Sequence, residues 1–301
     1  MRAQGEDCNP DMRAALEHLL AAGGKRIRPT LCLLVGNMLG GNSDTLVTLG
    51  AAVELLHTAT LVHDDLIDGA LLRRGAETIN ARWSSAATVL TGDFLFARAA
   101  KLAAETDNVL LMRYFAETLA VIVNGELTQL FSARGVINRE NYYQRIYAKT
   151  ASLFEMSTRA AAMISTDDAA ILESTRKFGY ELGMAFQIVD DLLDFTGEQS
   201  TVGKPLGSDL LQGLVTLPAI YYAEANPEHP DVRSLAAGGW GDHERMERLV
   251  QSIRNSDAIR QAMREAEGHV QRAIDSLPPF DDSQERAALE DLARYVVDRR
   301  V

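Results

Sequence analysis

The chain has 301 residues, of which 47% are hydrophobic and 24% charged, so it can bury a sizeable core and has the composition of a packed globular protein. Its 42 acidic and 30 basic side chains give a net charge of −12, which argues against general nucleic-acid binding because a phosphate backbone requires a basic face. The chain has only two cysteines, Cys8 and Cys32, which are too few for a disulfide framework. A reducing compartment fits this cysteine content best. We find no long apolar run or signal peptide in the sequence, so we expect a cytoplasmic protein without stable membrane insertion.

Apolar residues recur at three- and four-residue spacing, interrupted by short breaks of Gly, Asn, Asp or Pro, and alternating β-branched runs are scarce. This pattern predicts an all-α fold. No Gly- or Ser-rich linker divides the chain, so we predict one helical-bundle domain over residues 1–301. In chain order, the predicted helices cover 11–22, 28–40, 45–69, 86–104, 108–132, 139–163, 168–195, 208–225, 242–276 and 283–300.

Two of the predicted helices carry the same acidic pattern, in LVHDDLID (61–68) and in QIVDDLLD (187–194). Helix positions i and i+4 lie on one face about 6 Å apart, so each segment presents a patch of carboxylates. The flanking residues are apolar, which indicates packed helices. The first cluster is Asp64, Asp65 and Asp68, and the second is Asp190, Asp191 and Asp194.

Two such clusters require cations. Like charges about 4 Å apart repel by roughly 1 kcal/mol in water and by about 4 kcal/mol at an effective dielectric constant of 20. A single acidic triplet is more often a solvated helix face, but two copies with identical spacing in apolar helices favour a metal site. Oxygen ligands with few His or Cys nearby favour Mg²⁺, which is usually held by a few carboxylates together with phosphate oxygens. A phosphate-bearing substrate is therefore implied.

Basic residues supply the second group of candidates. They lie in GGKRIRP (23–29), at Arg73 and Arg74, in YAKT (147–150) and in Gly203-Lys204-Pro205. Each one taken alone is more often a surface charge than a ligand.

Together with the aspartate clusters, these residues resemble the trans-isoprenyl diphosphate synthases, also called polyprenyl synthetases. The resemblance runs from about Gly23 to the C-terminus through GGKRIRP, HTATLVHDDLID, RRG, Gly92-Asp93, Lys149-Thr150, FQIVDDLLDFTG and GKPLGSDL. It implies the isoprenoid synthase fold with a central active-site cavity. It also implies a prenyltransferase that joins isopentenyl diphosphate to an allylic diphosphate, and a homodimer.

The resemblance assigns roles to individual residues. Asp64 and Asp68, with Asp65 behind them, would hold two of about three Mg²⁺ ions on the allylic diphosphate, and Asp190, supported by Asp191 and Asp194, would hold the other. Lys149 would act with these aspartates in catalysis. Positions that match contacts to the allylic diphosphate are Arg73, Lys149, Thr150, Gln187 and Lys204. Positions that match the isopentenyl diphosphate pocket are Lys25, Arg28, His57 and Arg74. His63 matches no ligand position and is interpreted as structural.

In this family, product length follows the side chains four and five residues before the first aspartate, here Thr60 and Ala59. Because both are small, they would leave the tunnel open, and Leu56, Val53 and Phe115 would set the limit. We expect a medium or long all-trans product. A shorter farnesyl or geranylgeranyl product is the alternative.

Two other functions compete. A class I terpene cyclase would share the first cluster and the helical fold, but it would usually carry a different metal motif in place of the second cluster. A non-catalytic subunit of a heteromeric synthase would generally lose aspartates or pocket basics, whereas this chain retains them apart from Leu214, where many relatives carry a lysine. We therefore expect an active synthase.

Overall fold

The computed structural model describes residues 10–21, 23–131, 134–197, 206–279 and 283–299. Within these residues almost every element is a helix, and the one sheet is a two-stranded hairpin, so the predicted all-α class is confirmed. The chain divides into two compact units. The first contains Met1–Glu117 and Met156–Leu172, and the second contains Thr118–Glu155 and Glu173–Val301. The single domain over 1–301 stays a prediction.

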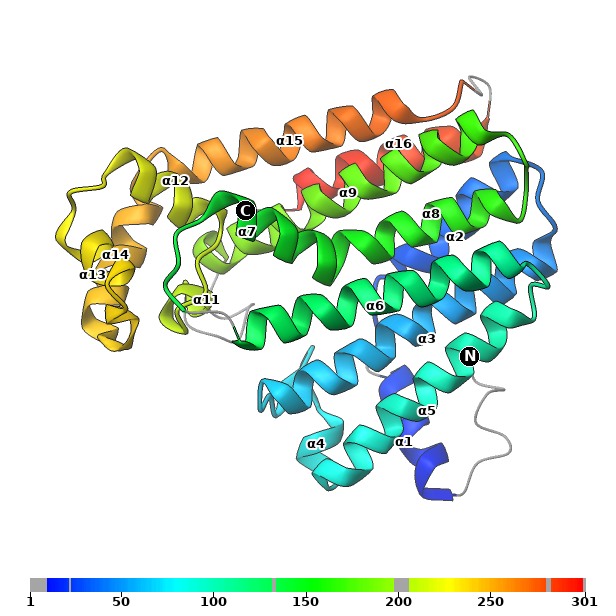
Figure 1. Ribbon diagram of the computed structural model, residues 1–301, viewed down its shortest axis with the longest axis horizontal. Coiled ribbons are helices and arrows are strands. Elements are labelled where there is room, and N and C mark those ends of the chain that lie inside the picture. Colours follow the sequence, from blue (N-terminus) through cyan, green and yellow to red (C-terminus); the bar gives the residue numbers. More distant parts are fainter. Residues whose placement is uncertain (1–9, 22, 132–133, 198–205, 280–282, 300–301) are drawn as a thin grey trace. The chain divides into compact units, whose positions relative to one another are not determined.

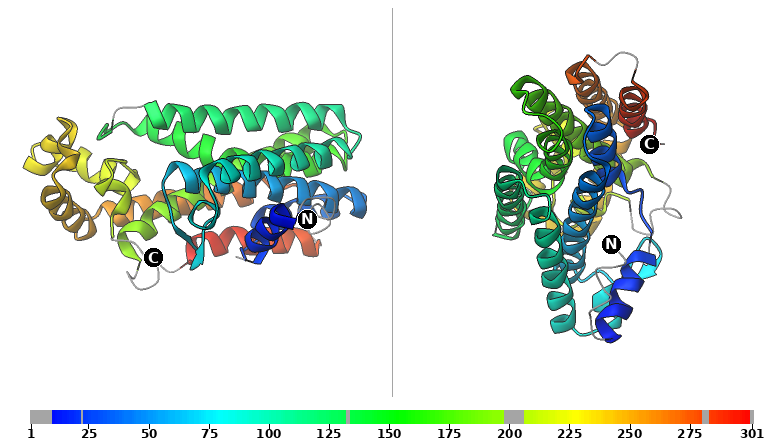
Figure 2. Two further views of the ribbon diagram at one scale, coloured as in Figure 1. Left: turned by 90° about the horizontal axis from the view of Figure 1, so that it is seen from below. Right: turned by 90° about the vertical axis from the view of Figure 1, so that its right-hand side faces the viewer.

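The first unit is built around one long central helix, α3. Its elements are α1 (Pro10–Ala21), α2 (Ile27–Met38), α3 (Ser43–Ile67), β1 (Leu72–Arg73), β2 (Ala76–Glu77), α4 (Ile79–Arg82), α5 (Ser85–Ala104), the start of α6 (Val109–Phe131) and the end of α8 (Ser152–Met163). Helix α3 packs along α5 and α2 (Figure 1 and Figure 2).

Helix α3 begins where Asn42 accepts hydrogen bonds from the backbone N–H groups of Asp44 and Thr45, which satisfies two donors of the first turn. By length and composition alone it could cross a membrane, but 56% of its most apolar window is buried within the protein. Such burial is the ordinary state of a core helix. Close approach to α5 depends on Gly92, because a Cβ there would lie 2.2 Å from Nε2 of His63.

The second unit contains the long helix α9 (Ala169–Thr196) from Glu173 onward, together with the C-terminal helices. Its other elements are the end of α6, α7 (Arg139–Ile146), the π-helix η2 (Tyr147–Ala151), the start of α8, α11 (Ser208–Leu211), α12 (Leu217–Ala225), α13 (Pro230–Ala236), the 3₁₀-helix η3 (Gly239–Gly241), α14 (His243–Arg254), α15 (Ala258–Ser276) and α16 (Gln284–Asp298). Helix α15 packs against α12 and α16 (Figure 1).

Most predicted helices agree with observed ones within two or three residues, but the sequence reading was wrong at three places. The predicted helix 208–225 is broken, because Gly213 adopts φ 79° between α11 and α12. The predicted helix 242–276 is likewise two helices, α14 and α15. The hairpin β1–β2 and the short elements α4, α13 and η3 were not anticipated, because segments of two to seven residues carry little periodicity.

Candidate active site

The first aspartate cluster lies at the C-terminal end of α3. Asp64 and Asp65 are in the last turn of the helix, and Asp68 is its C-terminal cap. The negative end of the helix dipole adds to the charge of the three carboxylates, so this end of α3 favours a cation. Asp65 is buried and accepts a hydrogen bond of 2.7 Å from Nε of Arg73. Asp64 is half-buried and Asp68 is exposed.

A tight hairpin presents the two arginines that follow this cluster. Arg74 and Gly75 form the turn between β1 and β2, with φ values of 53° and 78°. Two consecutive positive φ angles are the signature of a two-residue hairpin turn whose twist matches its strands. Arg73 thereby reaches back to Asp65, and Nη1 of Arg74 donates a 2.6 Å hydrogen bond to the carbonyl of Gly23.

A basic pocket lies beside the first cluster, within the first unit. Its lining includes Arg26, His57, Arg73, Arg74 and Asp65. The pKa of His57 lies well below its usual value because the ring is buried and Arg28, Arg74, Arg73 and Arg26 surround it with positive charge. His57 is therefore neutral near pH 7, and the positive charge of the pocket comes from its three arginines, which face the carboxylates of Asp65, Glu54 and Glu77 in the same lining.

The residues predicted for this pocket are only partly brought together. His57 and Arg74 line it, and Arg28 lies half-buried in the first turn of α2, near enough to act on His57. Lys25 is exposed in the loop before α2. Arg26 was missed. It lies in the GGKRIRP motif, at φ 51°, and pairs with the buried Glu54.

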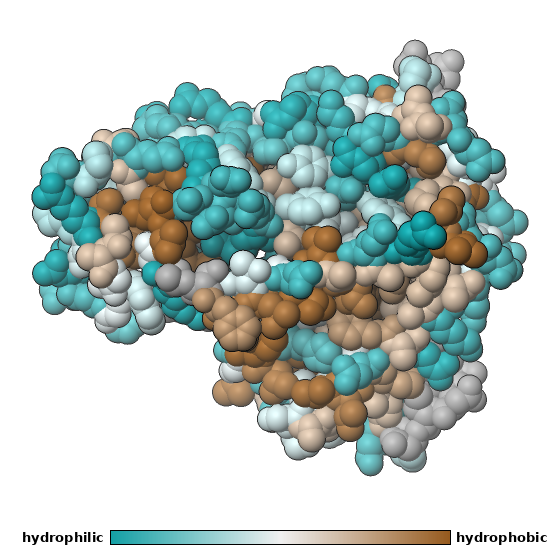
Figure 3. All heavy atoms as spheres, viewed as in Figure 1, coloured by the Kyte–Doolittle hydropathy of each residue, from teal (hydrophilic) through white to brown (hydrophobic). Residues whose placement is uncertain are grey.

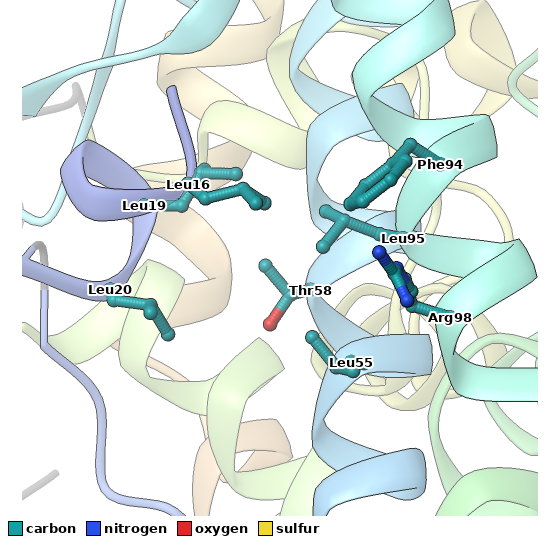
Figure 4. A pocket seen from close by; sticks show the side chains of 8 residues that line it. All are labelled: Leu16, Leu19, Leu20, Leu55, Thr58, Phe94, Leu95 and Arg98. Carbon is teal, nitrogen blue, oxygen red and sulfur yellow. The ribbon is translucent and has the colours of Figure 1, made fainter. Parts of the chain in front are cut away.

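Helix α1 forms a wall of the basic pocket and of a second, apolar pocket. Figure 4 shows Leu16, Leu19 and Leu20 of α1 facing Leu55 and Thr58 of α3 and Phe94, Leu95 and Arg98 of α5. Leu19 and Thr58 line both pockets. His18 of α1 donates a 2.6 Å hydrogen bond to the carbonyl of Glu77, which joins α1 to the hairpin.

The residues predicted to control product length also lie on α3. Ala59 is completely buried, whereas Thr60 is half-buried and donates a 2.8 Å hydrogen bond to the carbonyl of His57. Leu56 and Val53 are fully buried on the same helix. Ala59 therefore sits in packed surroundings, where a larger side chain would displace its neighbours.

His63 is held by contacts that fit the structural role predicted for it. Its Nε2 donates a 3.2 Å hydrogen bond to the carbonyl of Val89, and its ring lies 5.3 Å from that of Phe96. Both partners belong to α5.

The second aspartate cluster lies in α9, within the second unit, and its three carboxylates have different environments. Asp190 is half-buried, and its Oδ1 accepts a 2.8 Å hydrogen bond from Nη1 of Arg299. The Arg299 guanidinium also lies 4.1 Å from the ring of Phe186 and donates to that residue's carbonyl. No local pattern in the sequence pointed to Arg299.

Asp191 is buried, and protein donors hold both of its oxygens. Nε2 of Gln187 donates to Oδ1 at 2.8 Å, and the hydroxyl of Tyr142 donates to Oδ2 at 2.8 Å. Burial, together with the charge of Asp209, raises the pKa of Asp191 to about 7, although the two hydrogen bonds oppose the shift. Tyr142 was not among the predicted site residues.

Asp194 acts as a brace for the segment that follows α9. Its carboxylate accepts hydrogen bonds from the backbone N–H of Ser208 at 3.1 Å, the Ser208 hydroxyl at 2.7 Å and the backbone N–H of Asp209 at 3.2 Å. These donors lie in the first turn of α11, so Asp194 fixes the start of that helix.

Lys149 and Thr150 lie in the π-helix η2. Such single π turns are frequent at functional sites because they shift the side chains that follow. Nζ of Lys149 pairs with Glu126 at 2.9 Å, and the hydroxyl of Thr150 donates to Oε1 of Gln187 at 2.6 Å. Lys204 lies outside the described residues. Leu214 is half-buried, and its N–H donates to the carbonyl of Asp209.

The carboxylates present fit Mg²⁺ in kind, since it prefers hard oxygen ligands. The Arg299 guanidinium on Asp190 shows that this carboxylate accepts a cation in the folded chain. Among the residues that the structure describes, no three His, Cys, Asp or Glu side chains gather into a metal cage. Mg²⁺ does not need one, because it keeps waters and shares phosphate oxygens. The two clusters belong to different units, and their meeting at one cavity stays a prediction.

Known proteins resemble the chain over almost its whole length. The all-trans-nonaprenyl-diphosphate synthase (geranyl-diphosphate specific) of Rhodobacter capsulatus is 39% identical, with 94% of this chain and 87% of that protein covered. Component 2 of the heptaprenyl diphosphate synthase of Geobacillus stearothermophilus is 38% identical, with 98% and 92% covered. The crystal structure of a polyprenyl synthase from Caulobacter crescentus, complexed with calcium and isoprenyl diphosphate, matches with a TM-score of 0.90 and 37% identity, covering 100% of this chain and 92% of that one.

The polyprenyl synthetase family model matches residues 9–253, which is most of the chain. The solved relative confirms the all-helical fold that the motifs implied. The chain therefore belongs to the polyprenyl synthetase family and is a prenyltransferase.

Proposed function

We propose that the protein condenses isopentenyl diphosphate with an allylic diphosphate, head to tail and with Mg²⁺, to make a polyprenyl diphosphate. The observation that carries the proposal is the pair of Asp-Asp-x-x-Asp segments, each in a packed helix, together with the basic pocket beside the first. Anionic substrates and divalent cations are what these groups would bind. The relatives named as polyprenyl diphosphate synthases support the same reaction.

The basic pocket is proposed to take isopentenyl diphosphate. Arg26, Arg73 and Arg74 line it, and the charge of Arg28 also reaches His57. A neutral imidazole adds no fourth positive charge to the pocket, but its N–H can still donate a hydrogen bond to a phosphate oxygen. A diphosphate bound there would meet charge-assisted hydrogen bonds from guanidinium groups, which are among the strongest in proteins.

Asp64, Asp68 and Asp190 are proposed to hold about three Mg²⁺ ions, which would act as Lewis acids on the allylic diphosphate. Lys149, Gln187 and Arg73 would bind and orient that diphosphate, together with Lys204 outside the described residues. Their positive charge and N–H donors would stabilise the negative charge that grows as the carbon–oxygen bond breaks. No protein base is assigned, because the released diphosphate would accept the proton.

A medium or long all-trans chain is the proposed product, because Ala59 and Thr60 place no bulky side chain on this part of α3. The named relatives that make nonaprenyl and heptaprenyl products support this length. Ala59→Phe should shorten the product by at least one isoprene unit, which reversed-phase chromatography of the dephosphorylated products would measure. An unchanged product distribution would count against control by this position.

We propose a cytoplasmic homodimer. The helix α6 exposes apolar side chains, among them Val123, Leu127, Leu130 and Phe131, at the helical spacing of one stripe, and Phe131 is 81% exposed. Figure 3 shows hydrophobic side chains gathered over this helix. A second copy of the chain could cover this stripe. A heteromeric enzyme is the alternative, because one close relative is named as component 2 of a synthase.

One experiment tests the function and the partner together. The purified chain is incubated with Mg²⁺, labelled isopentenyl diphosphate and geranyl, farnesyl or geranylgeranyl diphosphate, and its products are sized. Elongation by the chain alone would support a self-sufficient synthase, and its mass in solution would give the number of subunits. Substrate binding without elongation would favour a subunit that needs a partner, and a cyclic hydrocarbon product would favour a terpene cyclase.

A further inference from the structure

The loop that precedes α2 holds one residue in an unfavourable backbone conformation. Gly23, Gly24 and Arg26 have positive φ values of 72°, 154° and 51°. The two glycines adopt such angles readily, whereas Arg26 carries a Cβ that makes the left-handed region unfavourable. Arg26 is also the N-terminal cap of α2, and its side chain makes no capping hydrogen bond. The conformation of Arg26 therefore needs support from a contact elsewhere in the fold.

That contact is an ion pair with Glu54 of α3. Nη1 of Arg26 donates a hydrogen bond to Oε1 of Glu54, and Glu54 is buried. A buried carboxylate is stable only when a cation and hydrogen-bond donors replace the water it has lost. The other two arginines of the basic pocket are bonded elsewhere, Arg73 to Asp65 and Arg74 to a backbone carbonyl. Arg26 is therefore the guanidinium that neutralises Glu54.

The same ion pair fixes the loop that borders the basic pocket. A Cβ added at Gly24 would lie 2.6 Å from Nη1 of Arg74 and 3.7 Å from Cζ of Arg26, so the glycine lets both guanidinium groups approach the loop. Nη1 of Arg74 also donates to the carbonyl of Gly23, which lines the pocket. The position of Arg26 thus sets the position of the loop, and the loop in turn sets that of Arg74.

Glu54 lines a pocket that is proposed to bind an anion. Because like charges repel, a carboxylate that acted only through its charge would weaken the binding of a diphosphate there. Arg26 neutralises this carboxylate, so the pair as a whole adds little net charge to the pocket. The contribution of the pair is to hold the loop in place.

We propose that Glu54 is a positioning residue for isopentenyl diphosphate, which acts through Arg26, and that Arg26 anchors the loop without contacting the diphosphate. The inference rests on the proposed function, since it requires isopentenyl diphosphate in the basic pocket. It predicts a sign. Removing the charge of Glu54 weakens binding if the residue positions the loop, and strengthens binding if the residue acts by charge alone.

Binding is measured by calorimetry with isopentenyl diphosphate alone, which is not consumed because no allylic substrate is present. Glu54→Gln keeps the shape of the side chain and removes its charge, and it should weaken binding about tenfold. Steady-state kinetics should show a matching rise in KM for isopentenyl diphosphate, with kcat within about twofold of the wild type, because ground and transition states lose the same support. Affinity for an allylic S-thiolodiphosphate, measured with Mg²⁺, should stay at the wild-type value.

Arg26→Gln should weaken binding about as much as Glu54→Gln does. The double variant should lose no more than either single variant, because the two residues act as one unit. Arg26→Lys keeps a cation beside Glu54 and should recover most of the loss. Glu228→Gln is the matched control, because Glu228 pairs with Arg233 on the exposed surface of the second unit, and its affinity and Tm should equal those of the wild type.

Tighter or unchanged binding of isopentenyl diphosphate in Glu54→Gln would overturn the inference. A loss in Arg26→Gln without one in Glu54→Gln would do the same, because it would identify Arg26 as a direct ligand. Equal losses of isopentenyl diphosphate and of the allylic analogue would reduce Glu54 to a structural residue.

Glu54→Asp repeats the test if Glu54→Gln does not fold. It keeps the charge but is one methylene shorter, so weaker binding supports positioning and wild-type binding contradicts it. The proposed function is judged separately on the wild type. Failure to form polyprenyl diphosphate would refute that function, whereas product formation with wild-type affinity in Glu54→Gln would refute the inference alone.

Discussion

The two aspartate clusters share one sequence pattern, yet the fold uses them differently. In both, the middle aspartate is buried and held by the protein, Asp65 by Arg73 and Asp191 by Tyr142 and Gln187. The last aspartates differ. Asp68 is exposed at the end of α3, whereas Asp194 accepts three hydrogen bonds from the start of α11.

This difference gives a physical reason for unequal metal binding. Asp64 and Asp68 lie one helical turn apart, so the first cluster offers two carboxylates on one face. In the second, internal donors hold both oxygens of Asp191 and of Asp194, whereas Arg299 donates to Oδ1 of Asp190, so Asp190 is the carboxylate best placed for a metal. Identical spacing is therefore not evidence of identical roles. The carboxylate that braces the fold and the carboxylate that binds a cation are told apart by their donors.

The largest expected effect follows replacement of a ligand. Asp64→Ala should lower kcat by about a thousandfold, because it removes charge stabilisation of the departing diphosphate. Tm should change little. Steady-state kinetics and thermal unfolding measure the two, with Asp167→Asn, an exposed loop residue, as the control. Near-normal turnover in Asp64→Ala would remove the first cluster from the reaction.

The third aspartates provide the sharpest contrast. Asp194→Ala should lower the free energy of unfolding by about 2 kcal/mol, because two backbone N–H groups and a hydroxyl lose their acceptor. Asp68→Ala should leave stability unchanged and lower the rate. Urea unfolding of the two variants, with turnover measured alongside, separates these outcomes. Similar stability in both would contradict the assignment of Asp194 as a brace.

The contributions of His57 and Asp191 to stability should depend on pH with opposite signs. The lowered pKa of His57 means that its contribution to stability is present above the unfolded histidine pKa and is lost as the pH falls below it. The raised pKa of Asp191, about 7, means that its contribution is present at low pH and is lost as the pH rises through about 7. Each group can contribute a slope of up to about 1.4 kcal/mol per pH unit.

Urea unfolding measured at several pH values between about 5 and 8.5 would test the sign of both pH dependences. In His57→Gln the free energy of unfolding should no longer fall as the pH is lowered. In Asp191→Asn it should no longer fall as the pH rises toward about 7. If either variant kept the wild-type pH dependence, the corresponding side chain would not be the titrating group.

The smallest expected effect concerns Arg299. Because its guanidinium occupies Oδ1 of Asp190, Arg299→Ala should tighten binding of Mn²⁺, used as a probe for Mg²⁺, by about threefold. Electron paramagnetic resonance of free Mn²⁺ in the presence of diphosphate measures this directly. Asp190→Ala is the control, in which the Arg299 change should have no effect. Weaker binding in Arg299→Ala would mean that the arginine helps to hold the anionic ligand.

Sequence reasoning found the groups whose chemistry lies in their spacing. The two Asp-Asp-x-x-Asp segments, the GGKRIRP motif and the long helices could be predicted because i, i+4 geometry is local. It assigned no role to Arg26, and it missed Tyr142 and Arg299 as parts of the site. Tyr142 precedes Lys149 by seven residues, which is two helical turns and was an available signal. Arg299 is 109 residues from Asp190, and no local pattern connects them.

The sequence by itself determined the helical class, the family and the two carboxylate clusters, because periodicity, composition and short motifs are properties of neighbouring residues. Only the tertiary structure decided which aspartate each donor satisfies. In the fold, Tyr142 donates a hydrogen bond to Asp191, Ser208 to Asp194 and Arg299 to Asp190. Such pairings depend on where distant helices pack, and burial then gives each carboxylate its charge and its role.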